Sequence, residues 1–205
     1  MLCDKCLSLM YCRLPATATR VLETLGKASQ DGEDFPYVDT TAKLSGLSRH
    51  QARIALQILA GAGLVWGQGC YGLSDNGHRL LHLLATNSLP DPATSLCNNC
   101  LREIGQGLSQ EAFKVLAVLN NPRYAVAGCN TAKLIGLTGL GMSALREALA
   151  RLEGAGLIVS ARGRAHRLSE DGHRLKVLLA RPAASTPSSA RPRPAAVSTA
   201  PVWAM

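Results

Sequence analysis

The sequence predicts a mainly helical protein with small β-hairpins, of the α+β class, in which one unit is repeated in tandem. The main observation is that Gly-Ala-Gly-Leu-Val at residues 61–65 returns as Gly-Ala-Gly-Leu-Ile at 154–158. A second motif, Leu-Ser-Asp-Asn-Gly-His-Arg-Leu at 73–80, returns as Leu-Ser-Glu-Asp-Gly-His-Arg-Leu at 168–175. Because segments repeated at a fixed spacing are the signature of a duplicated structural unit, we expect two similar domains.

Composition is consistent with two small folded domains and a tail. The chain has 205 residues, of which 47% are hydrophobic, 18% charged and only 4% aromatic, so Leu, Ala, Val and Ile must form the cores. After residue 180 the chain is mostly Ala, Pro, Ser and Arg, which cannot bury enough surface to offset its ordering entropy. The expected organisation is a Cys-x-x-Cys segment at 1–14, a domain at 15–85, a linker with a second Cys-x-x-Cys at 86–107, a domain at 108–180 and a disordered basic tail at 181–205.

Apolar periodicity and capping residues predict the elements of the first unit. Ser48 can cap a long helix, and the glycines at 61 and 63 end that helix. The expected elements are helices at 17–27, 41–45 and 48–60, a hairpin with strands at 64–66 and 70–73, and a final helix at 74–84. A helix, a helix-turn-helix, a hairpin and a further helix, in that order, form a winged helix.

The second unit repeats this order. Its expected elements are helices at 109–119, 131–135 and 143–153, strands at 157–160 and 165–168, and a helix at 170–179. The two copies are offset by 94 residues at Cys3, 93 at Gly61 and 95 at Leu73. Aligning the two Thr-Ala-Lys-Leu motifs predicts that the second turn, at 136–141, is about three residues longer than its counterpart at 46–48.

Three segments of each unit carry a resemblance to a known family. They are residues 41–48, 59–65 and 73–77 in the first unit, and 131–137, 152–158 and 168–172 in the second. These segments resemble the winged helix-turn-helix domains of MarR-like bacterial DNA-binding regulators. Members of that family carry one winged helix per chain and dimerise, and they lack paired Cys-x-x-Cys motifs. The resemblance therefore implies DNA binding by a covalent pseudo-dimer, acting as a monomer or as a homodimer.

The charge distribution agrees with a polyanionic partner. The net charge is +8 and the isoelectric point is near 9.4. Residues 1–100 hold eight basic and eight acidic side chains, whereas 101–180 contribute +5 and the tail +3. The basic surface thus belongs to the second unit and the tail, and double-stranded DNA is the expected partner. Ordinary solubility would account for the same total.

In a helix-turn-helix, the early exposed positions of the second helix contact base edges in the major groove. Arginine matches the acceptors of guanine, and glutamine matches the donor and acceptor of adenine. In the first unit the residues predicted to contact bases are Arg49, His50, Gln51, Arg53 and Gln57. In the second unit they are Ser143, Arg146 and Arg151. Glu147 lies beside them and repels phosphate, so this helix is expected to contact bases less strongly than the first one. The alternative is a helix face that is merely solvated.

The predicted hairpins differ in charge. The second one carries Arg162, Arg164, His166 and Arg167 around a tight turn, as a phosphate or minor-groove contact requires. The first hairpin turn, at 67–71, has no charged residue. The expectation is that the second unit contacts the DNA backbone mainly through its wing.

The sequence contains two Cys-x-x-Cys pairs, and each repeat begins with one of them. If the two units pack about a pseudo-twofold axis, Cys3, Cys6, Cys97 and Cys100 can bind one tetrahedral zinc ion. A redox-sensing thiol cluster, an iron–sulfur cluster and inert cysteines are the alternatives. Seven cysteines, an odd number, fit a reducing cytoplasm better than a disulfide framework.

Several classes of function lack their residues. There is no nucleophile–base arrangement and no phosphate-binding Gly-rich loop, so an enzyme is not expected. No apolar run approaches the ~20 residues of a membrane span. The sequence predicts a cytoplasmic DNA-binding transcriptional regulator with a structural zinc ion. The alternatives are a plasmid or phage replication or partition protein, and a winged-helix adaptor that binds another protein.

Overall fold

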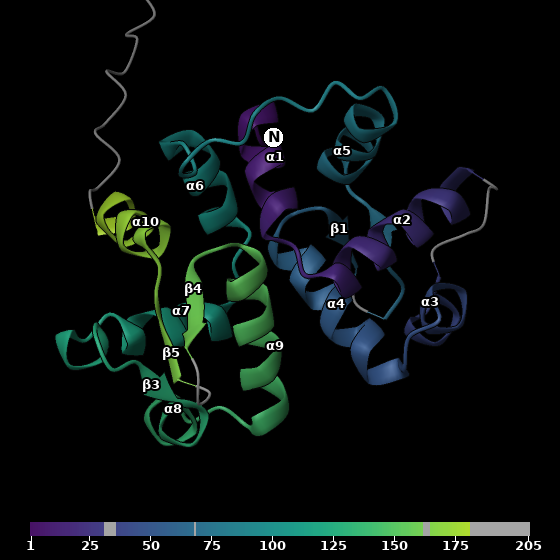
Figure 1. Ribbon diagram of the computed structural model, residues 1–205. Helices are drawn as coiled ribbons and strands as arrows, with labels where there is room; N and C mark the ends of the chain where they lie inside the picture. Colours follow the sequence, from purple (N-terminus) through teal and green to yellow (C-terminus); the bar gives the residue numbers. More distant parts are fainter. Residues whose placement is uncertain (31–35, 68, 162–164, 181–205) are drawn as a thin grey trace, which may run out of the picture.

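Two units with the same order of elements form the chain in the computed structural model, which describes residues 1–30, 36–67, 69–161 and 165–180 (Figure 1). The fold is mainly helical with two small antiparallel sheets, as predicted. The first unit comprises α1 (Asp4–Arg13), α2 (Ala16–Gln30), α3 (Val38–Ser45), α4 (Arg49–Gly61), β1 (Val65–Trp66), β2 (Gly72–Leu73) and α5 (Asp75–Ala85). The second comprises α6 (Asn98–Gln106), α7 (Gln110–Leu119), a short 3-10 helix (Pro122–Tyr124), β3 (Cys129–Asn130), α8 (Thr131–Thr138), α9 (Met142–Gly154), β4 (Ile158–Ala161), β5 (Ala165–Leu168) and α10 (Glu170–Ala180).

The sheets differ in size between the units. In the second unit, β3, β5 and β4 form a three-stranded antiparallel sheet in that spatial order. In the first unit, β1 pairs with β2. The pairing of β3 with β5 has as its counterpart there a single bridge between Tyr37 and Cys70. Both hairpins feed directly into the last helix of their unit. At that junction, Ser74 and Ser169 each donate a hydrogen bond of 2.6 Å to a glycine carbonyl, Gly63 and Gly156 respectively.

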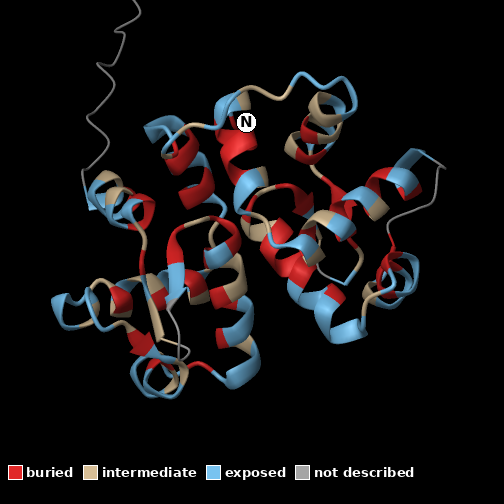
Figure 2. Cartoon of the chain, in the orientation of Figure 1, coloured by how far each residue is buried: buried red, intermediate tan, exposed pale blue. Residues whose placement is uncertain are grey.

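Helices α4 and α9 form a close contact between the two units. Gly61 faces the backbone of Arg151 and Gly154 faces the backbone of Ile58, so closely that a Cβ atom on either glycine would lie 2.0 Å from a carbonyl oxygen. Buried residues from both units form one continuous core across this contact. Figure 2 shows buried segments where the two helices meet and exposed segments at their other ends.

The crossing sets the pseudo-symmetry of the molecule. Gly61 corresponds to Gly154 and Ile58 to Arg151, an offset of 93 residues. The helix-ending glycines Gly46 and Gly139, with φ of 65° and 66°, share this offset. Hence α3 and α8 have equal length and their turns correspond. The predicted three-residue insertion at 136–141 is wrong: the two Thr-Ala-Lys-Leu motifs occupy different turns of their helices.

Among the described residues, two helices, one strand and the short 3-10 helix at Pro122–Tyr124 were not predicted. The Cys-x-x-Cys segment at 1–14 and the one in the linker at 86–107 were given no secondary structure, whereas they lie at the starts of helices α1 and α6. Strand β3 has only two residues and no sequence pattern of its own. The tail predicted at 181–205 lies outside the described residues.

Candidate metal centre and exposed helix ends

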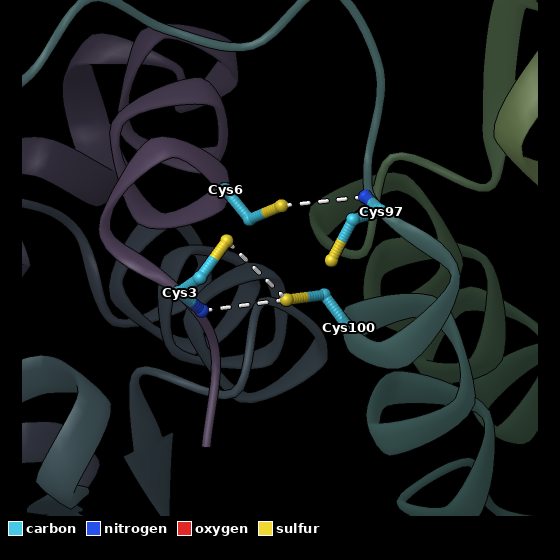
Figure 3. Close-up of side chains that lie close together, drawn as sticks. All are labelled: Cys3, Cys6, Cys97 and Cys100. Atoms are coloured by element: carbon cyan, nitrogen blue, oxygen red, sulfur yellow. Dashed lines mark hydrogen bonds between the residues drawn. The ribbon is translucent and has the colours of Figure 1, made fainter.

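The sulfur atoms of Cys3, Cys6, Cys97 and Cys100 all lie within 4.8 Å of one another, so the predicted cluster of four thiols is present and could hold a metal ion. Figure 3 shows the four side chains pointing toward one another, two from α1 and two from α6. Cys6 and Cys100 are buried, whereas Cys3 and Cys97 are at the surface. Cys12, the other cysteine near this end of the chain, is exposed and outside the cluster.

Local helix geometry explains the arrangement of each pair. Cys3 and Cys97 are the N-cap residues of α1 and α6, and Cys6 and Cys100 follow one turn later on the same side. The partial positive charge of a helix N-terminus favours thiolates at these positions. The two pairs also bond reciprocally: the Cys3 N–H donates to the Cys100 sulfur at 3.3 Å, and the Cys97 N–H donates to the Cys6 sulfur at 3.4 Å.

Side chains from the last helix of each unit anchor the two cysteine segments. Arg79 of α5 donates a hydrogen bond of 3.1 Å to the carbonyl of Leu2 and forms a 2.7 Å ion pair with Asp4. In the second unit, Arg174 of α10 donates a 2.7 Å bond to the carbonyl of Leu96. These arginines therefore fix the backbone on either side of Cys3 and just before Cys97. The sequence had indicated the repeat of Arg79 and Arg174 but not this role.

Proton affinity differs sharply among the thiols. Burial raises the pKa of Cys6 to about 11 and raises that of Cys100 as well. A hydrogen bond from the backbone of Cys100 lowers the pKa of Cys97 to about 7. At neutral pH, the buried thiols keep their protons unless a cation replaces those protons, as metal binding does.

The spacing fits a single ion. Tetrahedral coordination with metal–sulfur bonds of ~2.3 Å places the sulfurs about 3.8 Å apart. The Cys3 and Cys100 sulfurs are 3.8 Å apart. Four sulfurs in a tetrahedron are typical of zinc or iron. An iron–sulfur cluster, with several irons and sulfides at its centre, needs its cysteines farther apart than thiols gathered around one ion.

The residues of the first turns of α4 that were predicted to contact bases differ in how their side chains are engaged. Arg49, His50 and Arg53 are exposed and line an open hollow at the start of the helix. Arg49 is paired with Asp39 at 2.9 Å, but both side chains are largely exposed, so the pair is weak. Gln51 is instead engaged in a capping box, in which its side chain accepts the N–H of Ser48.

Gln57 and Arg151 were predicted to contact DNA, and for both the prediction is wrong. Gln57 is buried at 8% exposure, and its amide donates to the Tyr71 hydroxyl at 3.2 Å. Arg151 donates to Gln57 at 3.0 Å and forms an ion pair with Glu147 at 3.0 Å. Both side chains lie in the C-terminal parts of α4 and α9, where the two helices cross, so they bond to each other and to the hairpin residue Tyr71 instead of facing a groove.

The remaining predicted residues lie in the second unit. Ser143 and Arg146 are exposed at the start of α9, and Arg167 is exposed on β5. His166 is half-buried beside Ser160, and burial lowers its pKa, so it is uncharged at neutral pH. Arg162 and Arg164 lie outside the described residues.

Sequence reasoning missed one buried acidic residue. Asp171 is 2% exposed and accepts from Arg13 at 2.9 Å, from Arg174 at 3.0 Å and from the Leu96 N–H at 3.2 Å. Asp171 is the second residue of α10, and an acidic side chain at such a position usually interacts favourably with the positive end of the helix dipole. Its position therefore does not by itself indicate burial. The sequence does contain one signal for this residue: the two repeats differ here, since the first copy has Asn76 where the second has Asp171.

Comparison of the chain with protein-family models, curated proteins and solved structures finds no match. Within the described residues, no helix combines the length and apolar character that crossing a membrane requires.

Proposed function

We propose that the protein is a DNA-binding transcriptional regulator whose two winged helix-turn-helix units act as a covalent pseudo-dimer, with a structural zinc ion bound by the four cysteines. The order of elements in each unit supports the fold assignment. So does the strand order β3-β5-β4, in which a short strand before the helix-turn-helix joins the sheet of the hairpin. In this assignment α4 and α9 are the recognition helices and β4–β5 is the larger wing.

The observation that carries the proposal is the placement of the two helix starts. Because α4 and α9 cross near their C-terminal ends, their N-terminal ends diverge, and both point to the lower edge in Figure 1. The cysteine-bearing helices α1 and α6 lie on the opposite side. Arg49, His50 and Arg53 on one helix, and Ser143 and Arg146 on the other, are thus exposed at one edge of the molecule. A duplex lying along that edge would meet both helices.

A zinc ion would serve this arrangement by joining the units at the far end. Four thiolates, two from each unit, would link α1 to α6 while the Gly61–Gly154 crossing holds α4 to α9. Two separate attachments restrict rotation of one unit against the other. The ion is assigned a structural role because all four protein ligands are thiols, which leaves no open coordination position for a substrate.

Selection of bound fragments from random duplex DNA tests the DNA proposal. We expect a defined motif, and an affinity that falls steeply with salt as counterions are released from phosphate. Arg49→Ala with Arg53→Ala should lower affinity at least tenfold, since each good base contact contributes ~1–3 kcal/mol. The matched control is Arg102→Ala, an exposed arginine of α6 on the opposite side, which should bind almost as the wild type does.

Equal binding by the Arg49/Arg53 variant and the wild type would contradict this assignment. Promoter-proximal fragments recovered from genomic DNA would favour a regulator, and origin or partition sites would favour the replication or partition alternative. Metal analysis of the same preparation should find one zinc per chain, and Cys100→Ser should lose the zinc while Cys12→Ser keeps it.

A protein-binding adaptor is the second candidate, and one observation favours it. Ile54 on α4 is 40% exposed beside the arginines, and Leu44 of α3 and its counterpart Leu137 of α8 are 53% and 51% exposed. Half-exposed apolar side chains at equivalent positions suit docking to a protein. Replacing Leu44 and Ile54 with Ser should leave DNA binding intact under the first proposal and abolish partner capture under the second.

A further inference from the structure

We propose that a cavity between the two units binds a small organic cation of the alkylguanidinium type. The cavity has a volume of about 160 Å³, well above the ~15 Å³ that a single water needs. Its walls are the C-terminal ends of α4 (residues 60–63) and α6 (residues 104–108), together with Leu2, Asn76, Glu103 and Arg151. It is separate from the thiol cluster and from the exposed helix starts, and the proposal is independent of DNA binding.

The same place in the other half of the molecule is filled by the chain itself. There the guanidinium of Arg13 lies against Gly156, with its nitrogen 2.6 Å from the position a Cβ would take. The same nitrogen donates to the carboxylate of Asp171 at 2.9 Å. Arg13 is the last residue of α1, so its side chain enters this space from the C-terminal end of that helix.

The two places correspond residue by residue. Leu2 and Leu96 are equivalent, since each gives its N–H to the side chain at 76 or 171 and its carbonyl to Arg79 or Arg174. With the same offset of 94, the counterpart of Arg13 is Gly107. A glycine therefore leaves open in the first half the slot that an arginine side chain fills in the second.

Electrostatics favours a cation in this slot. The C-terminal ends of α4 and α6 meet there, and each carries a partial negative charge from its aligned peptide dipoles. Glu103 lies at the wall of the cavity, and its carboxylate is offset by the terminal ammonium of Met1, with which it pairs at 3.0 Å. Arg151 also lines the cavity, but Glu147 and Gln57 engage its guanidinium, so its charge is largely offset. In place of the Asp171 carboxylate, Asn76 offers its amide oxygen, which already accepts the Leu2 N–H.

Size and shape follow from the filled half. An n-propylguanidinium ion is the side chain of Arg13 without its backbone, so it is the natural probe. With Asn76 in place of an aspartate, the expected dissociation constant is on the order of 1 mM, a typical value for so small a ligand. N-propylurea has nearly the same shape without the charge and should bind far more weakly.

Titration of the metal-loaded protein, followed by backbone amide NMR shifts, tests the proposal. We expect shifts at Asn76 and Gly107 with n-propylguanidinium and almost none with N-propylurea. Gly107→Arg should abolish binding, because the new side chain fills the slot; a Cβ at Gly107 meets only carbonyl oxygens at 3.6 and 3.9 Å, so the residue is tolerated. Asn76→Asp should tighten binding about tenfold by supplying a charged acceptor.

The matched control is Gly136→Arg, which adds the same charge where a Cβ has nothing within 4 Å. This variant should bind the probe as the wild type does. Absence of shifts at Asn76 and Gly107 in the wild type, with the probe at up to about 20 mM, overturns the proposal. So does equal binding by the wild type and Gly107→Arg, which would place the probe elsewhere.

Discussion

At the scale of single residues, Asp171 connects a polar contact between the units, made by Arg13, to contacts within the second unit, made by Arg174 and the Leu96 N–H. Removing this buried carboxylate in Asp171→Ala takes the acceptor from the Arg13 guanidinium and the Leu96 N–H, and leaves Arg174 with the Leu96 carbonyl and Asn98. Because breaking a buried charge network is costly, we expect the free energy of unfolding to fall by about 3 kcal/mol, measured by urea denaturation. Asn76→Ala, at the uncharged equivalent position, should cost about half as much.

Glu170→Ala is the control for Asp171→Ala, since Glu170 is the preceding residue and is exposed. Its loss should cost less than about 1 kcal/mol, the contribution of a charge near a helix N-terminus. If Glu170→Ala and Asp171→Ala destabilise the protein equally, Asp171 acts only through the helix dipole and the contact with Arg13 contributes nothing.

Arg79 illustrates a residue that would act on the proposed metal centre through the backbone. Arg79→Gln should remove the bonds to Leu2 and Asp4 and leave the segment before Cys3 mobile. Supporting residues of this kind change metal affinity by ~10–100-fold. We expect such a loss in a chelator competition, with the visible spectrum of the cobalt-substituted protein altered. Arg20→Gln, at an exposed position on α2, should change neither; unaltered affinity in Arg79→Gln would contradict the anchoring role.

The sequence predicted the cysteines and missed Asp171 for a physical reason. A thiol repeated at three-residue spacing in both units has few functions, so its pattern alone indicates a shared site. An aspartate near a helix start is common, and its burial depends on Arg13, a residue 158 positions away. For the residues predicted to contact DNA, periodicity placed Arg49, His50 and Arg53 on the exposed side of α4 correctly. Gln57 was misplaced because one sequence cannot show that α9 covers that part of α4.

At the scale of elements, the crossing of α4 and α9 depends on two glycines. In Gly61→Ala or Gly154→Ala the new Cβ would lie 2.0 Å from a backbone carbonyl oxygen, so the helices must separate. Overpacking of this kind typically costs 1–3 kcal/mol, and here backbone rather than a flexible side chain must move, so we expect a loss of about 3 kcal/mol or more by urea denaturation. The variants should also expose apolar surface, detected by dye binding.

Gly136→Ala is the matched control for the crossing, because Gly136 lies in α8 with open space around its Cβ position. Alanine should stabilise that helix by ~0.5–1 kcal/mol. Wild-type stability in Gly61→Ala would show that the helices cross at a greater distance than the structure has.

Element boundaries were predicted well where capping residues marked them. Strands β4 and β5 and the helices that follow Ser48 and Ser109 were located to within one residue. The alignment of the repeats failed at α3 and α8, since shared letters were matched rather than equivalent turns. Gly46 and Gly139, both with positive φ, mark the true correspondence. A left-handed helix end is a stronger constraint than a shared tetrapeptide, because few residues other than glycine adopt it.

At the scale of the whole molecule, two different attachments hold the units together. The apolar crossing of α4 and α9 buries side chains of both units, whereas the thiol cluster brings together Cys3 and Cys97, which are 94 residues apart in the sequence. A cross-link closing so long a loop restricts the unfolded chain and can stabilise the fold by on the order of 4 kcal/mol. The two contributions should therefore be separable by experiment.

If the four thiols bind zinc as proposed, removing the ion should lower the stability of the protein and leave its helices formed. With a strong chelator we expect an unchanged far-ultraviolet circular dichroism spectrum at 25 °C and a clear fall in the thermal midpoint, reversed by added zinc. A variant with all four cluster cysteines changed to Ser should show the lower midpoint from the start and no response to chelator or zinc. Since Gly136 lies in α8 and belongs to neither attachment, Gly136→Ala should raise the midpoint equally in the zinc-loaded and the zinc-free protein. Loss of the helical signal on chelation would mean that the apolar contact cannot form without the metal. Folding of the protein would then require the metal, which would contradict the expectation that it only adds stability.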